Sequence, residues 1–251
     1  MKRSNVLVVI PSYGHFDFVR KTILSLHWAA ADDASIPDYL IVDDASEEWE
    51  QIDWNLFPNP SCPKIHFEIR AGLTRSWNEG LIVARERGYT YAICANSDLV
   101  FAPGSIESLC GALDSGVALA GPLTNAPGFC RWQDVRSFLG KGEHQINDSP
   151  KNISQIALHL AALDIEPIQC PLNGFCLAAK TETWWSHSIS RSVVFNPSLP
   201  LEHNEVELQN RWYRAGAKTA MIVQSYVFHY RSVSRPKGLS GWLGTGAYRP
   251  L

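Results

Sequence analysis

The first half of the chain alternates short apolar runs with longer segments of helical periodicity. Three runs, at residues 6–10, 39–42 and 91–95, have the length and composition of strands that are buried on both faces of a sheet. Between them, apolar residues recur at near-helical spacing over 16–31 and 74–87. This alternation predicts an α/β protein with a mostly parallel central sheet and helices on both faces. Its ligand crevice is expected at the carboxyl ends of the strands.

Weaker patterns extend the prediction along the rest of the chain. We expect a strand over 65–69, Thr74 as the N-cap of the helix that follows it, and Pro103 at the start of a further helix. The remaining expected elements are a strand over 117–120, an extended segment over 168–179, a helix over 204–215 and a final strand over 219–229.

The composition is that of an ordinary globular protein. Hydrophobic residues make up 45% and charged residues 19% of the 251 residues, which argues against disorder and coiled coils. The formal net charge of −3 provides no broad positive field for a nucleic-acid backbone. No apolar run approaches the roughly 20 residues that span a bilayer, and the six cysteines form no C-x-x-C pair. These features predict a cytoplasmic protein without an integral membrane segment.

Polar residues follow the predicted strands at the edge where a crevice is expected. Asp43 and Asp44 end the second strand, and a carboxylate there can accept hydrogen bonds from a nucleobase or a ribose. Asp98 follows the strand at 91–95, where it can bind a divalent cation that also coordinates a diphosphate. Each of these residues alone is equally typical of a turn or a cap, so only their combination indicates a site.

Three further residues have two interpretations each. Arg75 lies in the first turn of a predicted helix, where it suits a phosphate or is simply solvated. Glu205 lies among acidic residues at the start of the helix over 204–215, where it stabilises the helix dipole or acts as a general base. His229 ends the last strand, as a structural histidine or as a metal ligand beside Asp98.

The order and spacing of these motifs resemble the inverting glycosyltransferases of family 2, which have the GT-A fold. The resemblance covers about residues 5–121 and 169–232. The segments that carry it are Val9-Ile10-Pro11-Ser12-Tyr13, Val42-Asp43-Asp44-Ala45-Ser46, Gly72 to Asn78, Asn96-Ser97-Asp98, Asn173 to Lys180, Asn204 to Leu208, and His229.

The resemblance implies a nucleotide-sugar donor, with a UDP-sugar as the favoured case. The positions that it assigns to nucleotide binding are Pro11, Ser12, Tyr13, Asp43, Asp44, Arg75, Asn78 and Asn96. The positions that it places near the donor sugar or the acceptor are Asn173, Gly174 and Glu202.

The resemblance also implies a mechanism. Glu205 matches the catalytic carboxylate, which removes a proton from the acceptor hydroxyl during a direct, inverting displacement at the anomeric carbon. Asp98 and His229 match positions that hold a divalent metal, Mn²⁺ or Mg²⁺. Asn96 stands where the family has the first Asp of its Asp-x-Asp motif, and its amide can hydrogen-bond a ribose or a phosphate.

The resemblance implies a single GT-A, Rossmann-like domain over residues 1–251. We expect a nucleotide-sugar-binding half over about 1–121, a variable insertion over about 122–168 and an acceptor-binding half with a tail over about 169–251. The acceptor stays open among a glycan, a lipid-linked intermediate at the membrane face, another hydroxyl compound and a nucleic acid. The oligomeric state is open as well.

The sequence leaves two alternatives to glycosyl transfer open. The first is a non-catalytic domain that binds a nucleotide or a glycan, which Asn96 suggests and which intact Asp98, Glu205 and His229 argue against. The second is a sugar nucleotidyltransferase, whose glycine-rich loop would have to follow the first strand. The chain has Pro11-Ser12-Tyr13-Gly14 at that place, so this alternative ranks lower.

Overall fold

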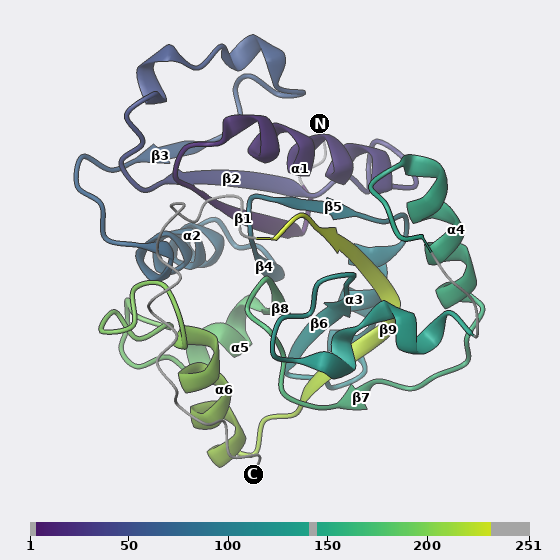
Figure 1. Ribbon diagram of the computed structural model, residues 1–251. Coiled ribbons are helices and arrows are strands. Elements are labelled where there is room, and N and C mark those ends of the chain that lie inside the picture. The colour runs from purple at the N-terminus through teal and green to yellow at the C-terminus, as the bar shows by residue number, and fades with distance from the viewer. Residues whose placement is uncertain (1–3, 141–144, 232–251) are drawn as a thin grey trace.

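The strands join in one curled sheet in the computed structural model, which describes residues 4–140 and 145–231 (Figure 1). Eight of the nine strands in the described ranges follow the order β3-β2-β1-β4-β8-β6-β9-β5, and the ninth, β7, pairs with β9. The strands are β1 (Val6–Ser12), β2 (Asp38–Asp43), β3 (Lys64–His66), β4 (Tyr91–Ala95), β5 (Leu99–Phe101), β6 (Leu119–Leu123), β7 (Ile168–Gln169), β8 (Cys176–Lys180) and β9 (Thr219–His229).

Strand direction confirms the predicted sheet. The neighbours β3, β2, β1 and β4 are all parallel, and β6 is parallel to β9. Strand β8 is antiparallel to β4 and β6, while β5 and β7 are antiparallel to β9. In register, Ser12 pairs with Asp43 and Asp43 with His66, so the carboxyl ends of three strands meet at one edge.

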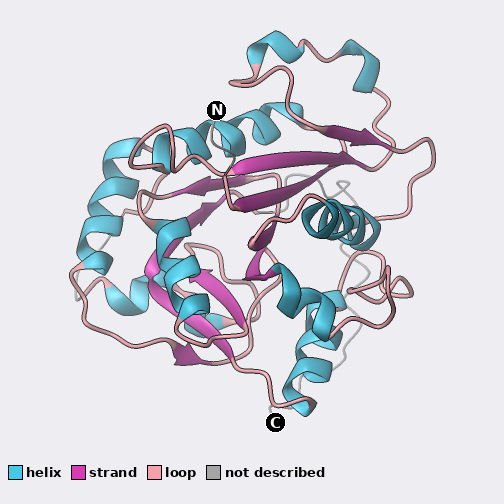
Figure 2. Ribbon diagram, turned by 180° about the vertical axis from the view of Figure 1, so that it is seen from behind, coloured by secondary structure: helices cyan, strands magenta, loops and turns pink. Residues whose placement is uncertain are grey.

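Helices cover both faces of the sheet, as the view from behind also shows (Figure 2). Side chains alternate along a strand, so Val8 and Ile10 of β1 pack with α1 and α3, whereas Leu7 and Val9 pack on the opposite face with the other helices. The helices are α1 (Phe16–Ala29), α2 (Leu73–Glu86), α3 (Ser105–Asp114), α4 (Pro150–Ala161), α5 (Thr181–Ser186) and α6 (Asn204–Arg214).

Short helical turns complete the connections. Turns η1 (Trp49–Gln51) and η2 (Trp54–Leu56) lie between β2 and β3, and turns η3 (Arg131–Gln133) and η4 (Val135–Phe138) follow β6. The segment over 122–168 contributes Val135, Ile153 and Leu160 to the core, and α4 packs against β9. This part of the chain is therefore built into the fold. None of the helices within the described ranges is long and apolar enough to cross a membrane.

Two predicted helix starts are wrong. The N-cap of α2 is Gly72, and Thr74 lies inside the helix, where its hydroxyl donates 2.5 Å to the carbonyl of Leu199. Helix α3 begins at Ser105 after the N-cap Gly104, two residues beyond Pro103. In both cases a glycine with positive φ supplies the turn into the helix. No predicted element covers the helix α4 or the short elements β5 and α5.

Candidate functional site

Asp43 joins the ends of β1, β2 and β3. Its Oδ1 accepts hydrogen bonds from the hydroxyls of Ser12 at 2.8 Å and Ser46 at 2.5 Å. Its Oδ2 accepts one from the backbone N–H of Ser46 at 2.8 Å and lies 2.8 Å from Nδ1 of His66. The carboxylate is fully buried, so these contacts replace the water that it loses and fix the shape of the strand ends.

Asp44 holds the turn that leads into α2. Its carboxylate accepts from the backbone N–H groups of Ala71 at 2.9 Å and Gly72 at 2.7 Å, and from Nη2 of Arg75 at 2.6 Å. Arg75 also donates to the carbonyl of Ile69. Charge-assisted bonds of this kind are stronger than neutral ones. The structure therefore brings together two predicted nucleotide-binding residues, Asp44 and Arg75.

Aromatic rings cover the two arginines of this turn. The guanidinium of Arg75 lies 3.7 Å from the ring centroid of Phe67, and that of Arg70 lies 3.7 Å from the ring centroid of Tyr13. Tyr13 follows β1 directly and is half-buried, whereas Pro11 lies within β1 and is buried. Tyr13 thus faces the turn that Asp44 organises, and it presents a ring and a hydroxyl there.

Asn78 has a structural function that the sequence did not reveal. Its Oδ1 accepts from the backbone N–H groups of Val194 and Phe195, both at 2.9 Å, and its Nδ2 donates to the carbonyl of Phe195 at 2.9 Å. The side chain is buried. These three bonds attach the segment around residue 195 to α2, and a contact of Asn78 with a nucleotide stays a prediction.

Asp98 and His229 lie side by side. Their strands pair so that Leu99 is opposite His229, and Nε2 of His229 lies 3.3 Å from Oδ1 of Asp98. The ring of His229 stacks on Phe175, with 5.3 Å between centroids. Its Nδ1 is buried and has no hydrogen-bond partner among the described residues. A carboxylate oxygen is an ordinary ligand of both Mn²⁺ and Mg²⁺, whereas an imidazole nitrogen suits a transition metal and so favours Mn²⁺ of the two.

Asp98 and His229 could supply two protein ligands to a metal ion. Within residues 4–140 and 145–231, no group of three or more His, Cys, Asp or Glu side chains could hold a metal ion. Asp98 and His229 fit such an ion as two protein ligands, with the other positions left to a diphosphate and water. Asn96 lies close to this pair, since its backbone N–H donates 2.8 Å to the carbonyl of Phe175.

Glu205 lies in the first turn of α6 and is 8% exposed. Burial raises the pKa of its carboxyl group, and smaller effects of nearby backbone N–H groups and of His203 oppose this rise. Gly174 packs directly against it, because a Cβ atom added to Gly174 would lie 3.1 Å from Cβ, Cγ and Cδ of Glu205. The structure therefore places the predicted base beside the predicted glycine.

The loop before α6 is attached to the start of α2. The backbone N–H of Thr74 donates 3.1 Å to the carbonyl of Pro200, and Nδ2 of Asn204 donates 2.7 Å to the hydroxyl of Thr74. At Gly72, which has a φ of 94°, an added Cβ would lie 2.5 Å from the oxygen of Pro200. These contacts set the position of Glu205 relative to the Asp44 turn. Glu202, in the same loop, is exposed.

Asn173 is held by the segment that follows β6. Its backbone N–H donates 2.7 Å to Oε1 of Gln133, and its Nδ2 donates 3.2 Å to the carbonyl of Pro127. Cys130 of this segment lies near Glu205. Burial raises the pKa of the Cys130 thiol to about 12, with smaller contributions from Cys170 and Glu205. Residues over 122–168 therefore help to form the site, and no local sequence pattern indicates the contact at Gln133.

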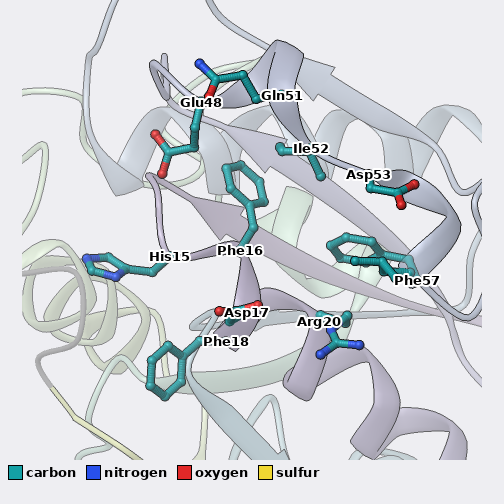
Figure 3. Close-up of a pocket in the computed structure, with 11 residues that line it drawn as sticks. His15, Phe16, Asp17, Phe18, Arg20, Glu48, Gln51, Ile52, Asp53 and Phe57 are labelled. Atoms are coloured by element: carbon teal, nitrogen blue, oxygen red, sulfur yellow. The ribbon is translucent and has the colours of Figure 1, made fainter.

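A hollow in the described surface is lined by none of the predicted site residues. It has a cavity volume of about 460 Å³ and lies between the start of α1 and the turns η1 and η2 (Figure 3). Its lining residues are His15, Phe16, Asp17, Phe18, Arg20, Glu48, Gln51, Ile52, Asp53, Leu56 and Phe57.

Comparison with known proteins decides the family. The sequence model of glycosyl transferase family 2 matches residues 7–168, which is more than half of the chain. The chain belongs to glycosyl transferase family 2. No curated protein matches it by sequence.

Solved glycosyltransferases share the fold of this family 2 member. GalNAc-T7, solved with UDP, GalNAc and Mn²⁺, has a TM-score of 0.66 at 17% identity over 91% of this chain and 44% of that one. TarS 1-349 of S. aureus, solved with UDP, has a TM-score of 0.57 at 11% identity over 89% of this chain and 60% of that one. The chain thus spans about half the length of these relatives.

These findings confirm the predicted family, the α/β GT-A fold and, at the level of the family, the glycosyltransferase class of enzyme. The assignments of individual site residues stay predictions.

Proposed function

We propose that the chain transfers a sugar from a UDP-sugar to an acceptor hydroxyl, with inversion at the anomeric carbon. The observation that carries this proposal is the buried carboxyl of Glu205, held against Gly174 in a chain of glycosyl transferase family 2. UDP is favoured as the leaving group because two structural relatives were solved with it. The acceptor and a cytoplasmic location stay predictions from the sequence.

In the proposed mechanism, Glu205 acts as the general base. Its raised pKa keeps the carboxylate basic enough to take the proton of an acceptor hydroxyl while that oxygen attacks the anomeric carbon. The bond from that carbon to the diphosphate oxygen breaks in the same step, so the configuration inverts. Gly174 supports this role because its missing side chain leaves room for the carboxyl group.

The donor would lie across the strand ends. Tyr13 and the turn fixed by Asp44 and Arg75 would hold the nucleoside, and Asn96 would contact the ribose or the phosphates. A divalent ion bound by Asp98 and His229 would supply Lewis-acid stabilisation of the departing diphosphate. The Mn²⁺ of the GalNAc-T7 structure supports this assignment.

A thermal-shift assay tests donor binding. The chain is heated with UDP, GDP, TDP or CMP, each with and without Mn²⁺. Binding to the native state alone stabilises it by about 2.7 kcal/mol at 100 times Kd, so UDP with Mn²⁺ should raise Tm by several degrees. Asp98→Ala should remove the part that depends on the metal, whereas Asp164→Ala, at an exposed position, should not. A well-folded chain that responds to no nucleotide would contradict the proposal.

A further inference from the structure

Gln209 lies one helical turn after Glu205 on α6, so both side chains are on the same face of the helix. The amide of Gln209 is buried. Its Oε1 accepts from the backbone N–H of Leu172 at 2.6 Å, and its Nε2 donates to the carbonyls of Leu172 at 2.8 Å and Glu205 at 3.0 Å. Both hydrogens and the oxygen of this amide are therefore used, which leaves it one orientation.

Gln133 binds the backbone of the next residue, Asn173, in the way that Gln209 binds the backbone of Leu172. Its Oε1 accepts from the backbone N–H of Asn173 at 2.7 Å, and its Nε2 donates to the carbonyl of Pro122 at 2.8 Å. This side chain is fully buried. Two buried glutamines from different elements thus fix the backbone of Leu172 and Asn173, one from α6 and one from the segment after β6.

The next residue along the chain is Gly174, whose backbone forms one wall of the space around the Glu205 side chain. The position of this wall depends on the two residues before it, and Gln209 connects them to the helix that carries Glu205. A buried amide whose partner is lost leaves unpaired backbone groups behind, so the wall would shift without Gln209.

We propose that Gln209 is a positioning residue for Glu205, and that it fixes the distance between the base and the wall formed by Gly174. This inference rests on the proposed function. Gln209 acts through the backbone of Leu172 and takes no part in the proton transfer. In this arrangement the carboxyl group keeps one conformation, and water is kept away from the side of it that faces Gly174.

The test compares three variants in the hydrolysis of a UDP-sugar without an acceptor, where water takes the place of the acceptor hydroxyl. Gln209→Met keeps the length of the side chain but cannot form its hydrogen bonds. Gln224→Met is the matched control, since Gln224 also donates to two backbone carbonyls, those of Leu163 and Ile165, away from the site. Glu205→Gln reports on the base itself.

We expect Gln209→Met to lower kcat by about 10- to 100-fold, the scale reported for a small misplacement of a reacting group. The Kd for UDP with Mn²⁺ should change by less than about twofold, because the nucleotide contacts are intact. The acid limb of the pH profile of kcat should move to lower pH, because water reaches Glu205 and lowers its pKa. Gln224→Met should match the wild type in all three quantities.

The inference is overturned if Gln209→Met matches Gln224→Met in kcat and pH profile, or if its kcat and UDP affinity fall together. If Gln209→Met does not fold, Gln133→Met tests the same wall from the other side and should give the same signature. A Glu205→Gln variant of normal turnover would instead refute the proposed base, whatever Gln209→Met does. The two failures are therefore distinguishable.

Discussion

At the scale of single residues, Glu205 has a buried carboxyl group that must be ionised in order to act as a base. Desolvation raises the pKa of its carboxyl group, so its ionised form at neutral pH destabilises the folded chain. Such a cost is common where a group is kept for catalysis. A structural acid at a helix start would gain stability from the dipole without being buried, which is the alternative that this burial disfavours.

Glu205→Gln should therefore be more stable than the wild type at neutral pH. A raised pKa in the folded state means that the carboxyl group contributes its stability below its unfolded pKa of about 4.3 and loses it as pH rises through the folded value. The variant should therefore have a higher Tm than the wild type at pH 7. The gain should vanish near pH 4. An equal or lower Tm of the variant at pH 7 would show that the carboxylate is stabilising there.

Gly174→Ala should lower turnover through steric contact with Glu205. The new Cβ would lie 3.1 Å from three carbon atoms of that side chain, so we expect a fall in kcat of about tenfold or more with UDP affinity retained. Gly111→Ala is the control, because Gly111 is an exposed residue of α3 whose added Cβ meets no atom within 4 Å. Steady-state kinetics and UDP titration measure both effects, and unchanged kcat in Gly174→Ala would exclude this contact from the mechanism.

At the scale of elements, the start of α2 and the loop before α6 are built as one unit. Gly72 adopts φ 94° and ψ 171°, a conformation that is essentially restricted to glycine. It lets the chain pass close to Pro200, five residues before Glu205. The turn that Asp44 holds and the helix that carries the base are thereby connected.

Gly72→Ala should destabilise the chain by about 1–3 kcal/mol from backbone strain alone, and by more because its Cβ would lie 2.5 Å from the oxygen of Pro200. Gly88→Ala is the control, since Gly88 also has positive φ but open space around it. Urea denaturation gives both free energies of unfolding. The free energy of unfolding should fall more in Gly72→Ala than in Gly88→Ala, and only Gly72→Ala should lower kcat. Equal effects of the two variants would mean that the approach to Pro200 is unimportant.

The sequence predicted helices and strands correctly where the hydrophobic pattern was long. It did not predict features that depend on contacts between distant parts of the chain. The apolar runs of β1, β2, β4 and β9 are strong local signals. Thr74 has the chemistry of an N-cap, yet Gly72 takes that position because only glycine fits the turn. Asn78, Gln133 and Gln209 bind backbone groups that lie far away in the sequence, so no local pattern reveals them.

At the scale of the whole molecule, the sheet brings three groups of residues to one side of the fold. Asp43 ends β2 and Asp44 follows it, Asp98 directly precedes β5, His229 ends the paired strand β9, and Glu205 comes from α6. Asn96 and Phe175 connect the second group to Gly174, which touches the third. The diphosphate and the sugar of a donor that lies across the strand ends would thus contact different groups of these residues.

An NMR time course of UDP-sugar hydrolysis shows which anomer of the sugar is released first. The wild type and Glu205→Gln are compared at UDP-sugar concentrations that saturate each of them to the same degree. The donors are UDP-glucose, UDP-galactose and their N-acetylated forms, all α-linked. We expect the wild type to release the β anomer first from at least one donor, and Glu205→Gln to lower the rate by about 10²- to 10⁴-fold while it still binds UDP. Release of the α anomer first, or an unchanged rate in Glu205→Gln, would contradict a single displacement with Glu205 as its base.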